Sequence, residues 1–241
     1  MNGARRERLL VVTDRRLAEA AGRTLLATVA SAVDAGAEEV LLREKDLAPA
    51  DRHELAVALR ETTARAEAHL YVAGDPDLAA EVGADGVHLS AADPWPGGKT
   101  DHRRLGVPGP AHRLWLGRSC HTVAELLDAG DHRADWMTYS PVFATSSKPG
   151  YGPALGLAGL AGLAQGCQAV RGAAVLALGG IGPGRAVGCS EAGAAGVAVM
   201  GAVMRADDPA AAVRMLLHEL RTPVPERRAP VTKRRTPVPE R

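Results

Sequence analysis

The chain has 241 residues, of which 46% are hydrophobic and 3% aromatic, and its formal net charge is +1. This length suffices for one large domain or two small ones. The near-neutral charge excludes a strong field that would draw the protein to nucleic acid or anionic lipid. The scarcity of aromatic residues argues against a stacking platform for single-stranded nucleic acid, and it predicts a core of Ala, Val and Leu.

The cysteines and the N-terminus indicate the compartment. Cys120, Cys167 and Cys189 are widely spaced and form no metal-binding or redox pattern. The first apolar run ends in Thr13-Asp14 and is too short for a signal peptide. No stretch approaches the ~18–20 apolar residues of a membrane span. We expect a soluble, cytoplasmic protein with no nucleic-acid or membrane partner.

Short apolar runs alternate with Ala- and Leu-rich segments of helical period. The strand candidates are residues 9–13, 40–43, 70–73, 86–89, 114–118, 136–142, 174–178 and 196–200. The helix candidates between them are residues 24–35, 50–66, 76–82, 122–129, 157–170, 184–192 and 208–220. The connection at 91–113 is rich in Pro and Gly and has room for only a short helix.

The strand candidates are near-continuous runs of Val and Leu, which is typical of parallel strands buried on both faces. Eight strand–helix units over residues 8–220 predict a single (β/α)8 TIM barrel, a fold that typically needs ~200–250 residues. An open doubly wound sheet is the structural alternative. We predict that the barrel domain spans residues 1–220.

The C-terminal segment 221–241 differs in composition from the rest of the chain. The sequence RTPVPER at 221–227 recurs unchanged at 235–241, and the residues between are rich in Arg, Lys and Pro. Dense proline blocks helix and central strand, and the segment has too little apolar surface to bury. We predict a disordered basic tail, for which a solvated appendage is a simpler interpretation than an electrostatic contact with an acidic partner.

Two glycine turns predict a phosphate site, because in a TIM barrel the loops after strands seven and eight commonly bind phosphate. Gly179-Gly180-Ile181 follows the seventh strand candidate, and Gly201-Ala202 follows the eighth. Glycine lets the backbone N–H groups approach an anion closely. A Gly-Gly pair alone is more often just a turn, but these two turns occupy the two positions expected for phosphate.

Polar side chains at other strand ends point to the same mouth. The loop after the sixth strand offers Thr145, Ser147 and Lys148 to an anion. Arg43 and Lys45 flank Glu44 at the end of the second strand, where two cations suit a diphosphate, although a surface charge cluster is the simpler explanation.

Three further residues are candidates for chemistry. His121, two residues after Ser119 in the predicted mouth, can take and give a proton near neutral pH, or it simply hydrogen-bonds a loop. Asp93 follows the fourth strand and suits magnesium beside ligand phosphates, although an Asp before Pro is more often a turn former. His88 is more simply a packed strand residue.

These residues, in this order, resemble the superfamily of thiamine phosphate synthase and the TenI-type thiazole tautomerases from about Leu9 to Leu220. The resemblance is carried by Val12-Thr-Asp14, Leu42-Arg-Glu-Lys45, Gly83-Ala-Asp-Gly-Val-His-Leu89, Gly117-Arg-Ser-Cys-His121, Pro141-Val-Phe-Ala-Thr-Ser-Ser-Lys-Pro149, Gly179-Gly-Ile181 and Gly196-Val-Ala-Val-Met200.

The resemblance implies roles for the site residues. The synthase joins a pyrimidine methyl diphosphate to a thiazole phosphate, with magnesium on the diphosphate. The resemblance to the synthase implies that Arg43 and Lys45 bind the diphosphate and that Lys148 lies at the leaving group. It also implies that Asp93 matches one magnesium ligand. Thr145 and Ser147 would lie near the thiazole phosphate, with the backbone at 180–181 and 201–202 completing its cradle.

One departure from the synthase pattern concerns the magnesium ligands. The synthase ends strand three in an Asn-Asp pair whose Asp is the other ligand, whereas Ala73-Gly74 stand here. Asp75 follows one position later, but its side chain is expected to point away from the magnesium site. The usual Gly-Gln-Glu-Asp after strand four is thinned to Ser90-Ala-Ala-Asp93. Losing half of the carboxylates weakens ionisation of the diphosphate, because the metal neutralises charge on the leaving group.

The tautomerase branch aromatises a thiazole phosphate carboxylate by moving a proton and needs no metal. His121 lies at the position of its catalytic histidine, a general acid–base group, although synthases often carry a histidine there too. The sequence alone therefore favours a tautomerase without cofactor. A magnesium-dependent synthase is the alternative, and a non-catalytic thiazole-phosphate-binding relative is the third. Barrels of this superfamily often pair, so a homodimer is compatible with the resemblance.

Overall fold

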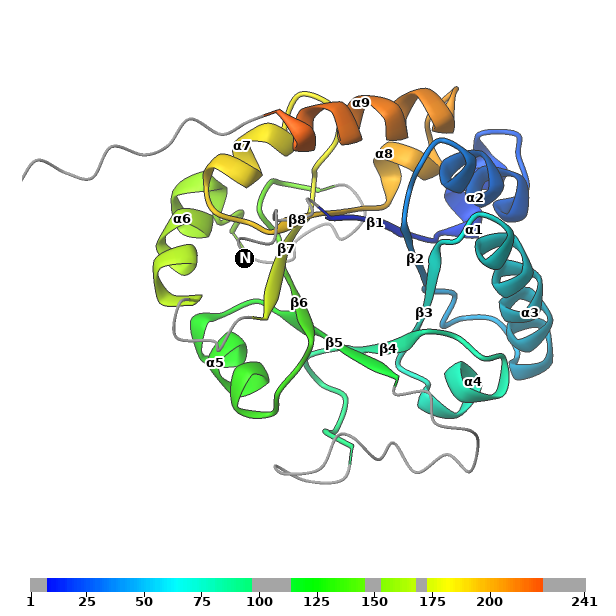
Figure 1. Cartoon of the computed structure of the whole chain (residues 1–241), viewed down its shortest axis with the longest axis horizontal. Coiled ribbons are helices and arrows are strands. Elements are labelled where there is room, and N and C mark those ends of the chain that lie inside the picture. Colours follow the sequence, from blue (N-terminus) through cyan, green and yellow to red (C-terminus); the bar gives the residue numbers. More distant parts are fainter. Residues whose placement is uncertain (1–7, 97–113, 146–152, 168–172, 223–241) are drawn as a thin grey trace, which may run out of the picture.

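Eight parallel strands close into a barrel in sequence order, and helices surround this central ring (Figure 1). The structure, a computed structural model, describes residues 8–96, 114–145, 153–167 and 173–222. The strands are β1 (Arg8–Val12), β2 (Glu39–Leu42), β3 (His69–Ala73), β4 (Gly86–Leu89), β5 (Trp115–Cys120), β6 (Trp136–Tyr139), β7 (Ala174–Leu178) and β8 (Gly196–Val199). The barrel closes where β1 pairs with β8, with Leu9 opposite Val197.

Helices follow the strands and form the outer layer. They are α1 (Arg15–Ala20), α2 (Leu25–Asp34), α3 (Pro49–Arg65), α4 (Pro76–Glu81), α5 (Val123–Asp131), α6 (Gly156–Cys167), α7 (Ala186–Glu191), α8 (Gly201–Met204) and α9 (Pro209–Arg221). Several begin at a polar cap. Asp14, Asp75 and Asp208 each accept a hydrogen bond from a backbone N–H three residues later, which satisfies a donor that the first helical turn leaves unpaired.

The predicted TIM barrel is confirmed, and the doubly wound sheet is excluded by the closed strand order. Each expected strand forms within a few residues of its expected bounds. The sixth ends at Tyr139 rather than at Val142, because Pro141 has no N–H with which to continue the ladder. The described part of the 91–113 connection, residues 91–96, contains no helix.

Two hydrophobic layers hold the fold together. The larger lies between the barrel and its helices and is built mainly from Val, Leu and Ala, as expected. The smaller fills the barrel interior and includes Tyr71 and Trp136, whose rings lie 5.3 Å apart. A Cβ on Gly117 would lie 2.5 Å from the Trp136 ring, so this glycine makes room for an aromatic plug that the composition did not predict.

Two other expectations concern the ends and surroundings of the chain. Among the described helices, none combines the length and the apolar character that crossing a membrane requires. The predicted basic tail lies outside the described residues from 223 onward, whereas its first residue, Arg221, is the last residue of helix α9.

Candidate active site

A cavity of about 850 Å³ opens at the carboxyl ends of the strands. In a TIM barrel this face carries the active site, because the loops that follow the strands meet there. Its described lining comes from the ends of all eight strands and the residues after them, from Val12 at the end of β1 to Arg205 beyond β8. The structure therefore brings the predicted site residues of the described chain to this cavity, except Asp93, which lies behind the lining beside Lys45.

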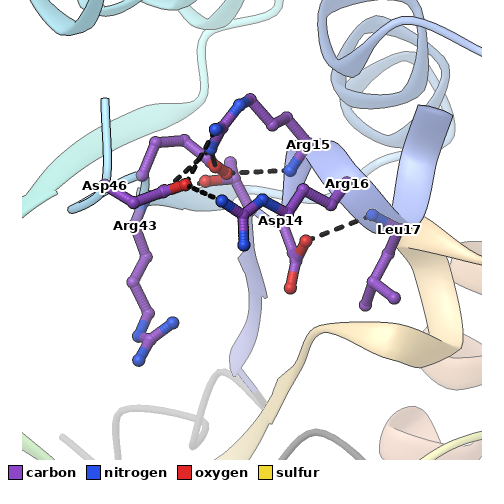
Figure 2. A network of polar contacts seen from close by, with 8 residues as sticks. Asp14, Arg15, Arg16, Leu17, Arg43 and Asp46 are labelled. Carbon is purple, nitrogen blue, oxygen red and sulfur yellow. Dashed lines mark hydrogen bonds and ion pairs between the residues drawn. The ribbon is translucent and has the colours of Figure 1, made fainter. Parts of the chain in front are cut away.

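Alternation along the end of β2 separates two cations from the carboxylate between them. Arg43 and Lys45 line the cavity, whereas Glu44 is buried on the other side and accepts hydrogen bonds from the backbone N–H and the guanidinium of Arg15. Figure 2 shows the Arg43 side chain directed away from the network of Arg15 and Asp46. Successive side chains of an extended strand point to opposite faces, so the Arg-Glu-Lys sequence delivers two positive charges to the cavity and directs the carboxylate elsewhere.

The same alternation operates at the end of β5. Ser119 and His121 line the cavity. The imidazole Nδ1 of His121 lies 2.9 Å from the carbonyl oxygen of Ser140; a carbonyl can only accept, so Nδ1 donates there. Arg118 points the other way and donates to the carbonyl oxygens of Ala91 and Asp93. The histidine ring is thus held in the cavity wall.

The turns after β7 and β8 lie side by side, and we call residues 179–182 and 201–202 the cradle, which extends the predicted turns by Gly182. All of these residues line the cavity. A Cβ placed on Gly182 would lie 3.4 Å from the Cβ of Ala202. No described residue accepts a hydrogen bond from the backbone N–H groups of Gly180, Ile181, Gly201 and Ala202. Two of them belong to the first turn of α8, where backbone N–H groups have no intrahelical acceptor, and an anion in the cavity could accept from all four.

The backbone conformation and the close packing at positions 179 and 180 also require glycine. Both have positive φ angles, 103° and 63°, a region that residues with a side chain rarely adopt. A Cβ on Gly180 would lie 2.5 Å from the carbonyl oxygen of Ala144. The bare backbone therefore lets the loop after β6 pack against the turn, which places Thr145 in the cavity lining beside the cradle.

The residues near Gly74 do not fit a metal site built from two protein carboxylates. Among the described residues, no three His, Cys, Asp or Glu side chains gather where they could hold a metal ion. Gly74 itself has no side chain, and Asp75 caps α4 and is bound by Arg52. Asp93 is the remaining carboxylate. One of its oxygens accepts from the Ser90 N–H and lies 3.7 Å from the Lys45 ammonium.

Charge around Asp93 favours its ionised form. Partial burial opposes ionisation, but the hydrogen bonds from Ser90 and the positive charges of Lys45 and Arg118 outweigh it and lower the pKa of Asp93. The carboxylate is therefore negative at neutral pH and is neutralised in part by Lys45. This part of the mouth offers more positive than negative charge to a ligand.

His88 is buried as expected, but it also lines the floor of the cavity. Its ring stacks on Trp136 at 4.7 Å, and Nε2 lies 3.3 Å from the Thr138 hydroxyl. Burial, followed by the charges of Lys45, Arg118 and Arg43, lowers the pKa of His88 to about 3. The imidazole is consequently neutral at pH 7 and adds no charge to the cavity.

The sequence did not reveal two arginines that line the cavity near the cradle, Arg185 and Arg205. The guanidinium of Arg185 donates to the carbonyl oxygen of Gly180 at 2.7 Å and lies over the Phe143 ring. The only sequence signal is their spacing, since they follow Gly180 and Gly201 by five and four residues. Ser147 and Lys148, also predicted here, lie outside the described residues.

Comparison with known proteins gives consistent results. A family model described as thiamine monophosphate synthase matches residues 9–203. A thiamine-phosphate synthase of Methanoculleus marisnigri is 39% identical over 208 residues, which cover 86% of this chain and 92% of the relative. One from Chloroflexus aurantiacus is 38% identical over 214 residues, covering 87% of this chain and 90% of the relative.

Solved structures agree with these relatives. A thiamine phosphate pyrophosphorylase from Pyrococcus furiosus has a TM-score of 0.73 and 29% identity, and the match covers 88% of this chain and 95% of the other. A 3-hexulose-6-phosphate synthase, at 18% identity and a TM-score of 0.60, shares the fold.

Proposed function

Because the chain belongs to the thiamine monophosphate synthase family, we propose that it is a thiamine-phosphate synthase. It joins a pyrimidine methyl diphosphate to a thiazole phosphate and releases diphosphate. The named relatives favour this reaction over the tautomerisation that the sequence alone favoured. It is the alternative that the motifs left open.

One observation carries the proposal: the cavity contains two separate sets of groups suited to anions. Arg43 and Lys45 come from the end of β2, and backbone N–H groups without an acceptor among the described residues come from the turns after β7 and β8. The strand order places β1 between the two sets. Two sites suit an enzyme that binds two phosphorylated substrates at once, whereas the tautomerase substrate carries one phosphate.

The proposed reaction makes limited demands on the protein. The thiazole ring nitrogen attacks the methylene carbon of the pyrimidine, the carbon–nitrogen bond forms, and the carbon–oxygen bond to diphosphate breaks. The electron pair of that bond leaves with the diphosphate oxygen. Arg43 and Lys45 stabilise the negative charge that develops there, and fixed charges in a preformed site act strongly on such charge. The cradle orients the thiazole by its phosphate.

Magnesium is expected with the synthase reaction, but the protein groups described here do not form a two-carboxylate site for it. We therefore assign diphosphate binding to Arg43 and Lys45 and assign no step to a metal. Lys148, which lies outside the described residues, remains a candidate at the leaving group.

The test is formation of thiamine phosphate from the two substrates by purified protein, measured with and without magnesium. Arg43→Ala is expected to lower kcat/KM by about 100-fold or more, as loss of a charged donor to a developing anion does. Arg16→Ala is the matched control, because Arg16 is 73% exposed and pairs with Asp46 outside the cavity. A wild-type protein that forms no thiamine phosphate from saturating substrates and magnesium would exclude the proposal.

The tautomerase remains a second candidate because His121 is held in the cavity wall by Ser140. Aromatisation of the thiazole phosphate carboxylate, followed by ultraviolet absorbance, tests it in the same preparation. His121→Ala should abolish that activity if the histidine transfers the proton. A tautomerase activity unchanged in this variant would remove His121 from the mechanism.

A further inference from the structure

Arg205 lies beside the cradle, and no described residue compensates its charge. It follows α8 directly, its side chain is exposed, and it lines the cavity. No hydrogen bond or ion pair joins its guanidinium to another described residue. By contrast, Arg185 is committed to the Gly180 carbonyl, so Arg205 is the cradle arginine with all its side-chain donors available within the described structure.

Gly201 makes this position possible. A Cβ on residue 201 would clash with a terminal nitrogen of Arg205 and would lie 2.7 Å from its Cζ. The guanidinium therefore lies directly against the Cα of Gly201, in the volume that any other side chain would occupy. Gly201 also supplies one of the cradle N–H groups that no described residue accepts from. The charge and the backbone donor thus lie at the same corner of the cavity.

We propose that Arg205 binds the monophosphate held by the cradle and selects the phosphorylated thiazole over its unphosphorylated alcohol. This rests on the proposed function for the identity of the substrate. A guanidinium presents a planar set of donors that matches phosphate oxygens. A neutral hydroxyl in the same place would gain little from it. Arg205 is a specificity residue in this account, acting in binding and not in bond formation.

The experiment compares Arg205→Gln with the wild type in steady-state kinetics. The KM for thiazole phosphate should rise about 10- to 100-fold, as expected for the loss of a charged hydrogen bond. The KM for the pyrimidine diphosphate should change little. The preference for thiazole phosphate over the alcohol should fall by a similar factor. Arg214→Gln is the control, because this substitution removes the same charge from a side chain on α9 that is 61% exposed.

Gly201→Ala provides a second, independent variant. Its effect should come through displacement of the guanidinium, because the atoms it meets are the flexible end of Arg205. The double variant Gly201→Ala/Arg205→Gln should then be no worse than Arg205→Gln alone, since residues that act as one unit are not additive. Fully additive losses would overturn the proposed link between the two residues.

Binding of inorganic phosphate, measured by calorimetry without turnover, separates this proposal from the proposed function. Weaker phosphate binding in Arg205→Gln but not in Arg214→Gln supports the role of Arg205, even in a protein without synthase activity. Equal phosphate binding and an equal KM for thiazole phosphate in the wild type and Arg205→Gln would overturn it, even if the wild type is an active synthase.

Discussion

At the scale of single residues, strand alternation decides which charges reach the cavity. The run Arg43-Glu44-Lys45 reads as a mixed charge cluster, yet the two cations line the cavity and Glu44 is bound to Arg15. The charge pattern alone favoured a surface cluster, and it was the resemblance to the synthase that implied a binding role for Arg43 and Lys45. Arg185 and Arg205 were not predicted, since a lone arginine in a helical segment is usually solvated.

Gly74 gives a prediction about magnesium. Gly74→Asp would place a carboxylate next to Asp93, because a Cβ there would lie 3.4 Å from an Asp93 oxygen and 2.9 Å from the flexible end of Lys45. We expect half-maximal turnover at a lower magnesium concentration. The φ angle of 69° costs about 1–2 kcal/mol of stability for a residue with a Cβ. A magnesium titration of activity measures the effect.

Gly74→Asn is the matched control for that variant, because it imposes similar backbone strain without a charge. If the Asp and Asn variants require the same magnesium concentration as each other, the added carboxylate does not take part in metal binding.

At the scale of elements, the strands were readily predicted and two helices were not. Runs such as residues 174–178 are apolar throughout, and the structure has a strand with the same bounds. Helices α1 and α8 were not among the candidates. At four residues, α8 is too short for a helical period to stand out. The cradle was anticipated from its glycines, but its contact with the loop at Ala144 depends on a tertiary approach that no local pattern encodes.

The segment after β4 is held to β5 by a stack of side chains. Arg118 binds two carbonyl oxygens of this segment, and its guanidinium lies 4.1 Å from the centre of the Trp95 ring. The Trp95 ring also stacks on the His132 ring, with the ring centres 4.4 Å apart. This stack fixes the backbone that carries Asp93 beside Lys45.

Arg118→Met should therefore loosen residues 90–96. We expect the free energy of unfolding to fall by about 1–3 kcal/mol, because two carbonyl oxygens lose a charged donor, and we expect amide exchange at 90–96 to accelerate. Urea denaturation and hydrogen exchange measure these effects, and exposed Arg65→Met on α3 is the control. Unchanged exchange at 90–96 would show that the stack does not hold the segment.

At the scale of the whole molecule, the barrel interior makes stability depend on pH. His88 is buried against Trp136, and its pKa falls to about 3 in the folded state, whereas an unfolded histidine titrates near pH 6.5. Below pH 6.5 the unfolded chain takes up a proton that the folded protein does not, so acidification favours unfolding.

This coupling gives a quantitative expectation. Between pH 7 and pH 5, His88 alone should lower the free energy of unfolding by about 2 kcal/mol. The contribution is fully present above pH 6.5 and is lost progressively as the pH falls towards 3. His88→Gln should remove this part of the pH dependence, as measured by urea denaturation at both pH values. The same slope in wild type and variant would mean that another group is responsible.

The contact between Gly201 and Arg205 has an evolutionary consequence. A methyl group at position 201 would displace the guanidinium of Arg205. Substitutions at positions 201 and 205 should therefore be correlated during evolution. Homologous enzymes with serine or alanine at the first site should rarely keep arginine at the second, and those that keep arginine should keep glycine with it.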